Sequence, residues 1–563
     1  MKNYIIILAL TAYSSHLFGQ NPTSNETQNY YKKVIKHLAS DELEGRLSGM
    51  EGEKKSAQFI KKEFIDAGLV GIENDSLYFQ QFPYTFLRLP SPKTTFLLVT
   101  RSGPLPGTLN KSFFLYSQTC DTGLANTLAF DAGYGMVVEK KSYNDYKNYT
   151  PQDSGKVFLI KLGHPELDNP HSEFGLVDNI HSKIELALKY HASGIVFYNT
   201  DSITDLPTGK LDKTTKPLNI PIFYTNLSFN ATEVMGVGME CYVSHVKYQA
   251  TNVIAQKWQS SKKKYIIFGA HHDHLGFGEM GGSRSENQEI HNGADDNASG
   301  VAMMLHLAKT LPKHRAFKKY NMVFIAFSGE ELGLLGSKYF VQNMGIDSSK
   351  VLCMFNFDMV GRLNPEHNTL VINGVGTSPY WKKRIKKIKT DTALLKITTT
   401  DGGIGASDHS SFYLANIPAV HFFSGQHREY HTPQDDDSLI NYAGMERIEN
   451  YTVKLACKYP KKKRNFTQTK NSATSFQKFK VTLGVMPDYT FTGGGMRIDN
   501  VSIGKTADKA GLQKNDVIIQ MGLHSISNVE SYMHALTHYN KGDTVNLLFL
   551  RNGVQQTVNI LFE

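Results

Sequence analysis

The segment GAHHDHLG (269–276) carries three histidines and one aspartate in four consecutive positions. Histidine nitrogens and carboxylate oxygens bind divalent metals such as zinc, and the same groups transfer protons in catalysis. If the preceding strand continues in extended geometry, His271 and Asp273 share one face, because side chains alternate along a strand. His272 and His274 then share the opposite face. Geometry therefore permits two chelating pairs, and the rest of the chain has to distinguish between them.

Further polar clusters stand beside apolar runs in the same region of the chain. They are NGADDNASG (292–300), SGEE (328–331), Asp358 and YHTP (430–433). Each cluster alone is typical of a helix cap or a solvated loop. Together, at neighbouring strand ends, they would repel and desolvate one another unless a cation lay between them. Carboxylates with two histidines and no cysteine suit zinc in a catalytic role, or manganese or cobalt as substitutes.

The elements that must position these clusters lie between residues 250 and 458. Apolar runs alternate there with helical patterns, and the runs are YIIFGA (265–270), MVFIAF (322–327), VLCMFNF (351–357), TLVING (369–374) and IPAVHFF (417–423). Such alternation predicts the α/β class, with a mostly parallel mixed sheet and helices on both faces. Residues 28–70 also have helical periodicity, with Gly68 as a stop signal. In sheets of this kind, ligands bind beyond the carboxyl ends of the strands, where every cluster falls.

The length and charge of the chain set further limits. Its 563 residues are too many for one core, so we expect about three domains. The formal charge of +9 arises from local runs such as WKKRIKKIK (381–389), which are typical of solvated faces or linkers. Because no nucleic-acid-binding motif accompanies these runs, we expect no nucleic-acid partner.

The N-terminus MKNYIIILALTAYSSHLFGQ (1–20) has the pattern of a secretory signal peptide. Its apolar stretch is too short to span a bilayer, and no other window is long and apolar enough to do so. No cysteine follows it to carry a lipid anchor. We therefore expect a secreted or periplasmic protein with no transmembrane segment in the mature chain. A Cys120–Cys241 disulfide is conceivable in that setting, but pairing cannot be read from sequence.

The ordered motifs resemble those of the co-catalytic dizinc aminopeptidases. That family includes bacterial leucyl aminopeptidases, glutamate carboxypeptidase and the transferrin receptor ectodomain. The resemblance covers about 28–88 and 248–458, including LASDELEGRLSG (38–49) near the N-terminus. It implies the zinc exopeptidase fold, in two segments at 21–89 and 248–460.

The resemblance also implies that each chain binds two Zn²⁺ ions, and it implies which residues bind each ion. His271 and Asp358 would bind one zinc, and Glu331 and His431 the other. Asp296 would bridge both ions. No ligand position departs from the family pattern.

Catalytic roles follow from the same resemblance and from charge. Two divalent ions and three carboxylates leave a net positive core, which lowers the pKa of a bridging water and favours an anionic tetrahedral intermediate. Glu330 would act as general base and pass the proton to the leaving amine. Asp273 would orient His271. We therefore expect an exopeptidase that hydrolyses peptide bonds, in particular an aminopeptidase acting on peptide or protein N-termini.

Other histidines near these motifs have less defined roles. With His271 as the ligand, His272 is expected to pack or hydrogen-bond behind the strand, and His274 to shape the loop. SDHSSF (407–412) resembles a family segment that lines the substrate side. For His409 within it, a lining role and a structural role are equally open.

Two accessory regions flank the predicted peptidase. Residues 90–247 are β-rich and resemble a protease-associated domain inserted into the peptidase. Residues 461–477 have the composition of a linker. Residues 478–563 resemble a PDZ domain, a small α+β domain that would bind a peptide as an added strand.

Three alternatives remain open. A glutaminyl cyclase on the same fold would work with one zinc. A carboxypeptidase would need a cationic pocket, for which Arg362 and Arg428 are the available residues. A non-catalytic, receptor-like binding protein would be expected to have lost metal ligands, and none is lost here.

Overall fold

A computed structural model describes residues 24–562 apart from short segments. These segments are 73–76, 168, 170–171, 175–177, 200–210, 212–216, 280–281, 286, 389–393, 459–464, 470–480, 488–490, 492–493, 502–503 and 527–528. The expected signal peptide (1–20) and most of the expected linker (461–477) lie outside the described residues. The chain divides into two compact units, Met1–Phe82 with Gln249–Glu563, and Pro83–Tyr248.

The larger unit contains the mixed, mostly parallel sheet that was predicted from the apolar runs. Four central strands pair in parallel with one another, and all their residues are buried except the half-buried Phe423: β12 (Tyr265–His271), β13 (Asn321–Phe327), β14 (Val351–Phe357) and β17 (Ala419–Phe423). The strand order is β16-β15-β17-β14-β12-β13-β11, with β15 (Thr369–Asn373), β16 (Lys396–Thr399) and the end of β11 (Val234–Lys257). The antiparallel pairs are β15 with β17 and β11 with β13. The carboxyl ends of β12, β13, β14 and β17 therefore lie at one edge.

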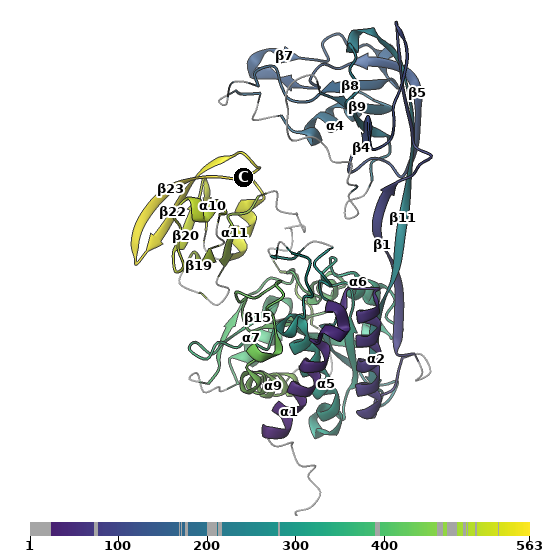
Figure 1. The fold of residues 1–563 in the computed structure, drawn as a ribbon. Helices are drawn as coiled ribbons and strands as arrows, with labels where there is room; N and C mark the ends of the chain where they lie inside the picture. The colour runs from purple at the N-terminus through teal and green to yellow at the C-terminus, as the bar shows by residue number, and fades with distance from the viewer. Residues whose placement is uncertain are drawn as a thin grey trace, which may run out of the picture. The chain divides into compact units, whose positions relative to one another are not determined.

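Helices cover both faces of this sheet, because alternate residues of each strand face opposite cores. Ile266 and Phe268 belong to one core with α1 (Ser24–Leu38), α2 (Glu51–Asp66), α5 (Gly300–Thr310), α7 (Pro379–Ile385) and α9 (Tyr442–Cys457). Ile267 and Phe327 belong to the other core with α6 (Leu335–Gln342) and α8 (His409–Leu414). Figure 1 shows α1, α2, α5 and α9 together in the lower part of the ribbon.

The helical region predicted at 28–70 is two helices separated by a short helical turn at Asp41–Arg46. Glu44, Gly45 and Arg46 have positive φ angles of 49°, 64° and 50°, so the chain reverses there. Gly45 is required at its position, because an added Cβ would lie 2.4 Å from the carbonyl oxygen of Gly276. The turn brings residues 45–48 to the loop after β12, where the backbone N–H of Gly276 donates to Gly45.

The smaller unit is built on a second mixed sheet. Its strands β5 (Thr122–Asp131), β8 (Val157–Lys161), β9 (Gly194–Tyr198) and β10 (Ile222–Thr225) are mutually parallel, and β4 (Phe113–Leu115) pairs antiparallel with β10. β2 (Thr95–Thr100), β3 (Gly103–Pro106) and the first part of β11 complete it, and α4 (Ile180–Lys189) packs against it. β1 (Phe79–Pro90) leads into the unit. Cys120 and Cys241 are both free thiols. The assignment of the smaller unit as a protease-associated domain stays a prediction.

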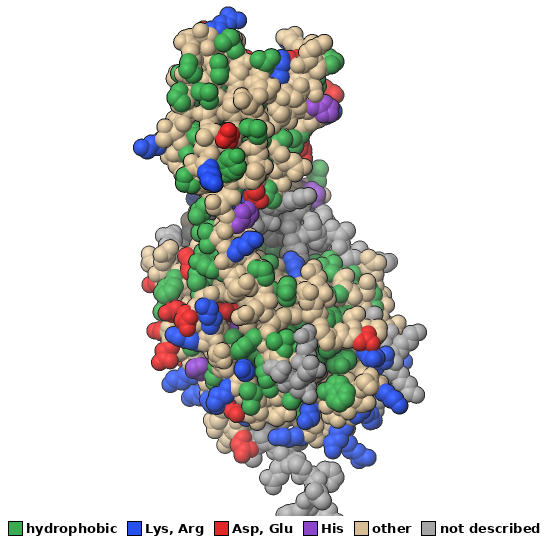
Figure 2. Space-filling model, turned by 90° about the vertical axis from the view of Figure 1, so that its right-hand side faces the viewer, with side chains coloured by type: hydrophobic (Ala, Val, Ile, Leu, Met, Phe, Trp, Pro, Cys, Tyr) green, Lys and Arg blue, Asp and Glu red, His purple; other side chains and the backbone are tan. Residues whose placement is uncertain are grey.

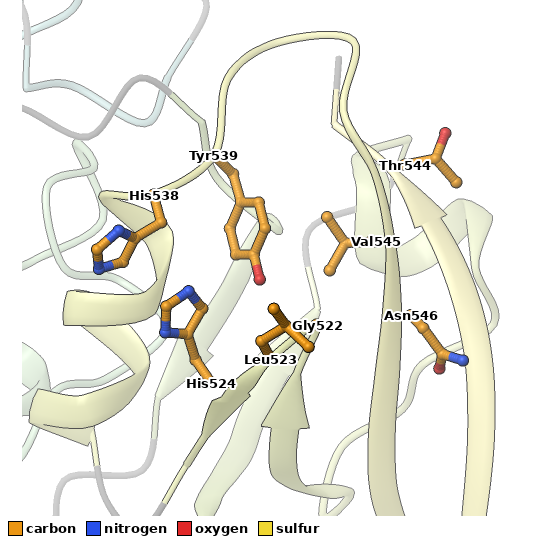
Figure 3. Close-up of a pocket in the computed structure, with 8 residues that line it drawn as sticks. All are labelled: Gly522, Leu523, His524, His538, Tyr539, Thr544, Val545 and Asn546. Carbon is orange, nitrogen blue, oxygen red and sulfur yellow. The ribbon is translucent and has the colours of Figure 1, made fainter. Parts of the chain in front are cut away.

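The C-terminal region has its own core, formed by strands β18 (Val485–Pro487), β19 (Met496–Val501), β20 (Val517–Met521), β22 (Thr544–Arg551) and β23 (Val554–Leu561). The short strand β21 (His524–Ser525) and helices α10 (Thr506–Lys509) and α11 (Val529–Leu536) accompany them. Figure 3 shows a pocket in this region, with His524, His538 and Tyr539 around it. No carboxylate lines that pocket, so it is separate from the acidic clusters.

Glu53 on α2 provides a test of the packing between α2 and the sheet. Its carboxyl group is fully buried and accepts the backbone N–H of Thr251 at 2.7 Å. Burial raises the pKa of Glu53 from 4.5 to about 7, although that hydrogen bond opposes the shift. A carboxyl group with a raised folded-state pKa favours folding fully below pH 4.5, and that contribution is lost as the pH rises through 7.

We expect Glu53→Gln to stabilise the protein at pH 8 by about 3 kcal/mol and to have little effect at pH 5, since each pKa unit corresponds to about 1.4 kcal/mol. Urea unfolding of both proteins, followed by tryptophan fluorescence at the two pH values, measures this difference. A stability gap that does not grow with pH would contradict the assigned protonation of Glu53.

Candidate metal centre

The first group of candidate ligands joins the ends of three chain segments. The Nε2 atom of His271, at the end of β12, lies 3.3 Å from Oδ1 of Asp296 and 3.4 Å from Oδ1 of Asp358. Asp358 follows β14, and Asp296 lies in the turn before α5. All three side chains are at least 90% buried. These atoms lie close enough together to share one metal ion.

The second group lies on the other oxygen of Asp296. The Nε2 atom of His431 lies 3.2 Å from Oδ2 of Asp296 and 3.2 Å from Oε2 of Glu331. Glu331 comes from the turn after β13, and His431 from the loop after β17. The two oxygens of Asp296 therefore face two different donor groups, which is the arrangement that a bridging carboxylate requires.

Both histidine rings are oriented by their other nitrogen. The Nδ1 atom of His271 lies 3.1 Å from the backbone oxygen of Asp273, and Nδ1 of His431 lies 2.9 Å from that of Gly282. A backbone oxygen only accepts hydrogen bonds, so each Nδ1 carries a proton, and Nε2 is the nitrogen of each ring that is directed toward the carboxylates and available to bind a metal. The carboxylate of Asp273 is farther from His271, at 3.7 Å.

Buried polar groups hold the acidic ligands in place. Oδ2 of Asp358 accepts the hydroxyl of Ser407 at 2.6 Å, so Oδ1 is left for His271. Asp435 accepts the backbone N–H groups of Asp295 and Asp296 at 2.9–3.1 Å. These contacts orient the turn that carries Asp296, whose peptide bond to Asn297 is cis. Asp435 follows His431 by four residues and was not predicted from the sequence.

The N-terminal segment contributes a buried cation that was also not predicted. The guanidinium of Arg46 donates to the backbone oxygens of His272 at 2.9 Å and Gly293 at 3.0 Å, and also to those of Leu38 and Asn292. It thus connects the loop after β12 with the turn that leads to Asp296. Although burial lowers the pKa of Arg46 to about 10, nearby carboxylates oppose the shift, and it stays charged at neutral pH.

Asp273 connects the first ligand loop with the predicted base. Its Oδ2 accepts the hydroxyl of Ser48 at 2.9 Å, and its Oδ1 accepts the backbone N–H of Glu330 at 3.2 Å. Asp273 is fully buried. It therefore determines where the backbone of Glu330 lies, in addition to its place next to His271.

The electrostatics of the cluster are those of a cation site. Burial lowers the pKa of His271, but Asp358 and Glu330 outweigh it and hold that pKa well above 6.5. Burial raises the pKa of Asp296, but hydrogen bonds from His271 and His431 hold it well below 3.8. For Glu330, burial and then the carboxylates of Asp358 and Glu331 raise the pKa well above 4.5, although His271 opposes the shift.

The residues fit a pair of divalent cations. Six carboxylates lie in or around the cluster: Asp273, Asp296, Glu330, Glu331, Asp358 and Asp408. In the described part of the chain, Arg46 is the one Lys or Arg side chain buried among them. The remaining negative charge is too costly to bury without positive charge between the groups. Two imidazoles with carboxylates, and no thiolate nearby, match catalytic zinc sites.

His271 and His272 lie on opposite faces of the strand, as the alternation of side chains predicts, but His274 does not lie where it was expected. His272 is held behind the strand by Ser56 and by the backbone oxygen of Thr251, each at 2.9 Å. His274, expected only to shape the loop, instead has its Nδ1 atom 2.8 Å from Oε1 of Glu331. β12 ends at His271, so alternation does not apply beyond it. His274 can therefore belong to the second donor group.

His409 is a core residue in the structure. It is 1% exposed, and its ring stacks on His421 with centroids 5.0 Å apart. Burial, with a smaller effect of His421, holds the pKa of His409 well below 6.5. These observations favour the structural role for His409 over the lining role.

Two family models match the chain. Residues 252–456 match the model of peptidase family M28, and residues 466–561 match that of a PDZ domain. The first match contains all five predicted metal ligands. The second begins before the predicted boundary at 478.

Curated relatives with similar sequences are named as aminopeptidases. Aminopeptidase YwaD of Bacillus subtilis is 34% identical over 28% of this chain and 35% of its own length. An aminopeptidase of Pseudomonas aeruginosa is 23% identical over 63% of this chain and 61% of its own length. The chain thus covers less than two thirds of each of these relatives.

Solved structures also align with this chain. An aminopeptidase from Aneurinibacillus sp. strain AM-1 is 20% identical, with a TM-score of 0.43, over 79% of this chain and 97% of that one. A zinc aminopeptidase from Bacillus subtilis is 21% identical, with a TM-score of 0.42, over 77% of this chain and 95% of that one.

The shared position of Asp296 predicts a graded loss of metal. We expect the purified protein to retain two equivalents of zinc after dialysis, Asp358→Asn to retain about one, and Asp296→Ala to retain less than one. Elemental analysis measures these values, and Asp401→Asn, on the surface, is a matched control that should retain two. Equal retention by the Asp296 and Asp358 variants would exclude a bridging role for Asp296.

Proposed function

We propose that this chain, which carries a peptidase family M28 domain and a PDZ domain, is a zinc-dependent aminopeptidase with two zinc ions per chain. The observation that carries the proposal is the division of Asp296 between two donor groups, each with its own histidine and carboxylate. The aminopeptidase names of the curated relatives support the same activity.

The five predicted ligands would hold the metals. His271 and Asp358 would take one zinc, Glu331 and His431 the other, and Asp296 both. Two bound zinc ions would supply Lewis acidity that polarises the peptide carbonyl and lowers the pKa of water at the site.

Glu330 is suited to move the proton. It lies beside the ligand Glu331 but takes no part in either donor group, and its backbone is anchored by Asp273. Burial and neighbouring carboxylates raise its pKa, so its carboxylate accepts a proton more readily than an exposed glutamate does. In its protonated form it can then donate to the amine of the leaving peptide. Asp273 would act as a positioning residue for both His271 and Glu330.

The charge of the site favours a free N-terminus over a C-terminus. With two zinc ions bound, the six carboxylates in and around the cluster still exceed the four positive charges of the metals and the one of Arg46, so a substrate α-ammonium is attracted and a substrate carboxylate is repelled. Arg362, which a carboxypeptidase would need for the substrate carboxylate, is already paired with Glu429 at 3.1 Å. These contacts support the aminopeptidase over the carboxypeptidase.

The remaining parts of the proposal concern export and partners. The N-terminal sequence supports export to the periplasm or the medium, and no helix in the described part of the chain is both long and apolar enough to cross a bilayer. The PDZ domain would bind a peptide by adding a strand to its sheet. Peptide N-termini would be the substrates of the metal site.

Removing the predicted base tests the mechanism. We expect Glu330→Gln to lower kcat at least a thousandfold and to leave the zinc content unchanged, because Glu330 is not a ligand. Glu366→Gln, on the surface, is the matched control and should keep full activity. Near-normal turnover by the Glu330 variant, with zinc bound, would refute the assignment.

The choice of chain end is tested with blocked substrates. We expect a peptide with a free N-terminus to be cleaved at least a hundredfold faster than its N-acetyl form, since acetylation removes the positive charge. Amidation of the C-terminus should change the rate less than twofold. Comparable kcat/KM values for free and N-acetyl peptides would contradict an aminopeptidase, and release of a C-terminal residue would favour a carboxypeptidase.

A further inference from the structure

One face of the larger unit collects lysines from four separate segments. We call it the basic face, and it comprises residues 257–264, 309–320, 380–388 and 451–458. These segments contain sixteen Lys and Arg residues and no Asp or Glu. Because the whole chain has a net charge of +9, the remainder of the chain is net negative. The basic charge is therefore concentrated in these segments.

Contacts join the four segments into one surface. Lys263 donates through Nζ to the backbone oxygen of Lys318 at 2.7 Å. The thiol of Cys457 lies 4.0 Å from Nδ1 of His314, and Nζ of Lys458 lies 3.4 Å from the backbone oxygen of Lys387. Residues 309–320 thus contact both 257–264 and 451–458, and 451–458 also contact 380–388, although the segments are far apart in sequence.

The charges of this face point to solvent. Among its exposed side chains are Lys262, Lys313, Arg315, Lys318, Lys383, Lys386, Lys387, Lys454 and Lys458. Asp401, from outside the segments, pairs with Lys382 at 2.6 Å. Figure 2 shows Lys and Arg side chains gathered along the lower end of this unit.

An exposed tryptophan lies on the same face. Trp258 directly follows β11 and is 51% exposed, whereas Trp381, the other tryptophan of the chain, is fully buried. The turn that carries Trp258 is anchored, since the backbone N–H of Gln259 donates to Asn321 at 2.7 Å. An exposed indole beside several lysines is typical of surfaces that rest at the interface between membrane and water.

The basic face lies opposite the metal centre. Residues 257–264 and 309–320 flank the amino ends of β12 and β13, whereas the ligands follow the carboxyl ends. These strands have seven residues each and span about 20 Å. A surface in contact with the basic face therefore leaves the metal centre open to solvent and to peptides.

We propose that the basic face docks this protein on an anionic phospholipid bilayer. Fourteen of its sixteen cations are lysines, which attract phosphate headgroups as point charges and need no fixed geometry. Nucleic-acid surfaces instead combine a groove with several aromatic side chains or with arginine forks. The basic face offers one exposed tryptophan and two arginines, so it fits a bilayer better than a nucleic acid.

The test uses the full-length protein and vesicles of phosphatidylglycerol and phosphatidylcholine at low ionic strength. Sedimentation should show binding that is absent with phosphatidylcholine alone and is reversed by 1 M salt, where charges are screened within about 3 Å. The tryptophan emission should shift to shorter wavelength on binding, and Trp258→Phe should remove that shift, since Trp381 is buried. Binding to both vesicle types alike, or to neither, would overturn the proposal.

Charge variants locate the contact. Lys262→Gln, Lys318→Gln and Lys387→Gln, combined in one protein, should weaken vesicle binding about a hundredfold, since each lysine near an anionic bilayer contributes about fivefold. The matched control combines Lys93→Gln, Lys111→Gln and Lys147→Gln, three exposed lysines of the smaller unit, and should bind like the unaltered protein. Equal loss in both proteins would contradict a specific face. Binding of duplex DNA without vesicle binding would identify a nucleic-acid surface instead.

Discussion

The mutual repulsion of buried carboxylates is the constraint on which the rest of this structure depends. Three of them converge on the two predicted metal positions, with Asp296 in the middle and both of its oxygens engaged. Burial at this density is stable only with positive charge between the groups. Histidine protons provide that charge in the absence of metal, and two divalent ions would provide it more strongly. Burial and, to a smaller extent, the same excess of negative charge raise the pKa of Glu330. That excess also favours a positively charged substrate end.

The fold serves this cluster by bringing four strand ends and one turn to a common edge. Parallel pairing of β12, β13, β14 and β17 places residues from distant parts of the chain within hydrogen-bonding distance. Arg46 then connects two of the ligand loops through the backbone oxygens of His272, Asn292 and Gly293, and it also donates to Leu38 at the end of α1. Because these acceptors are neutral, the guanidinium keeps its charge available to the surrounding carboxylates. The N-terminal helices are therefore part of the site, although they carry none of its ligands.

Much of the peptidase fold was predictable, because its strands are continuous apolar runs that end in polar clusters. The motifs also identified the residues that the structure brings together at Asp296. His274 was misplaced because β12 ends at His271, three residues before the point to which the alternation of side chains was extended. Arg46 could not be assigned, since its position depends on three consecutive residues with positive φ. Asp435 has a weak signal in its spacing from His431, but its backbone contacts to Asp295 and Asp296 arise only in the folded chain.

The candidate metal centre lies at the carboxyl ends of the strands and the basic face at their amino ends, so the proposed chemistry and the proposed attachment would use separate faces of the larger unit. The central claim is that Asp296 lies between two metal ions. Anomalous diffraction from crystals of the zinc-loaded protein, recorded on both sides of the zinc absorption edge, tests it most directly. The account predicts two peaks, one between His271 and Asp358 and one between Glu331 and His431, with Asp296 in contact with both. A single peak, or two peaks of which one does not touch Asp296, would contradict it.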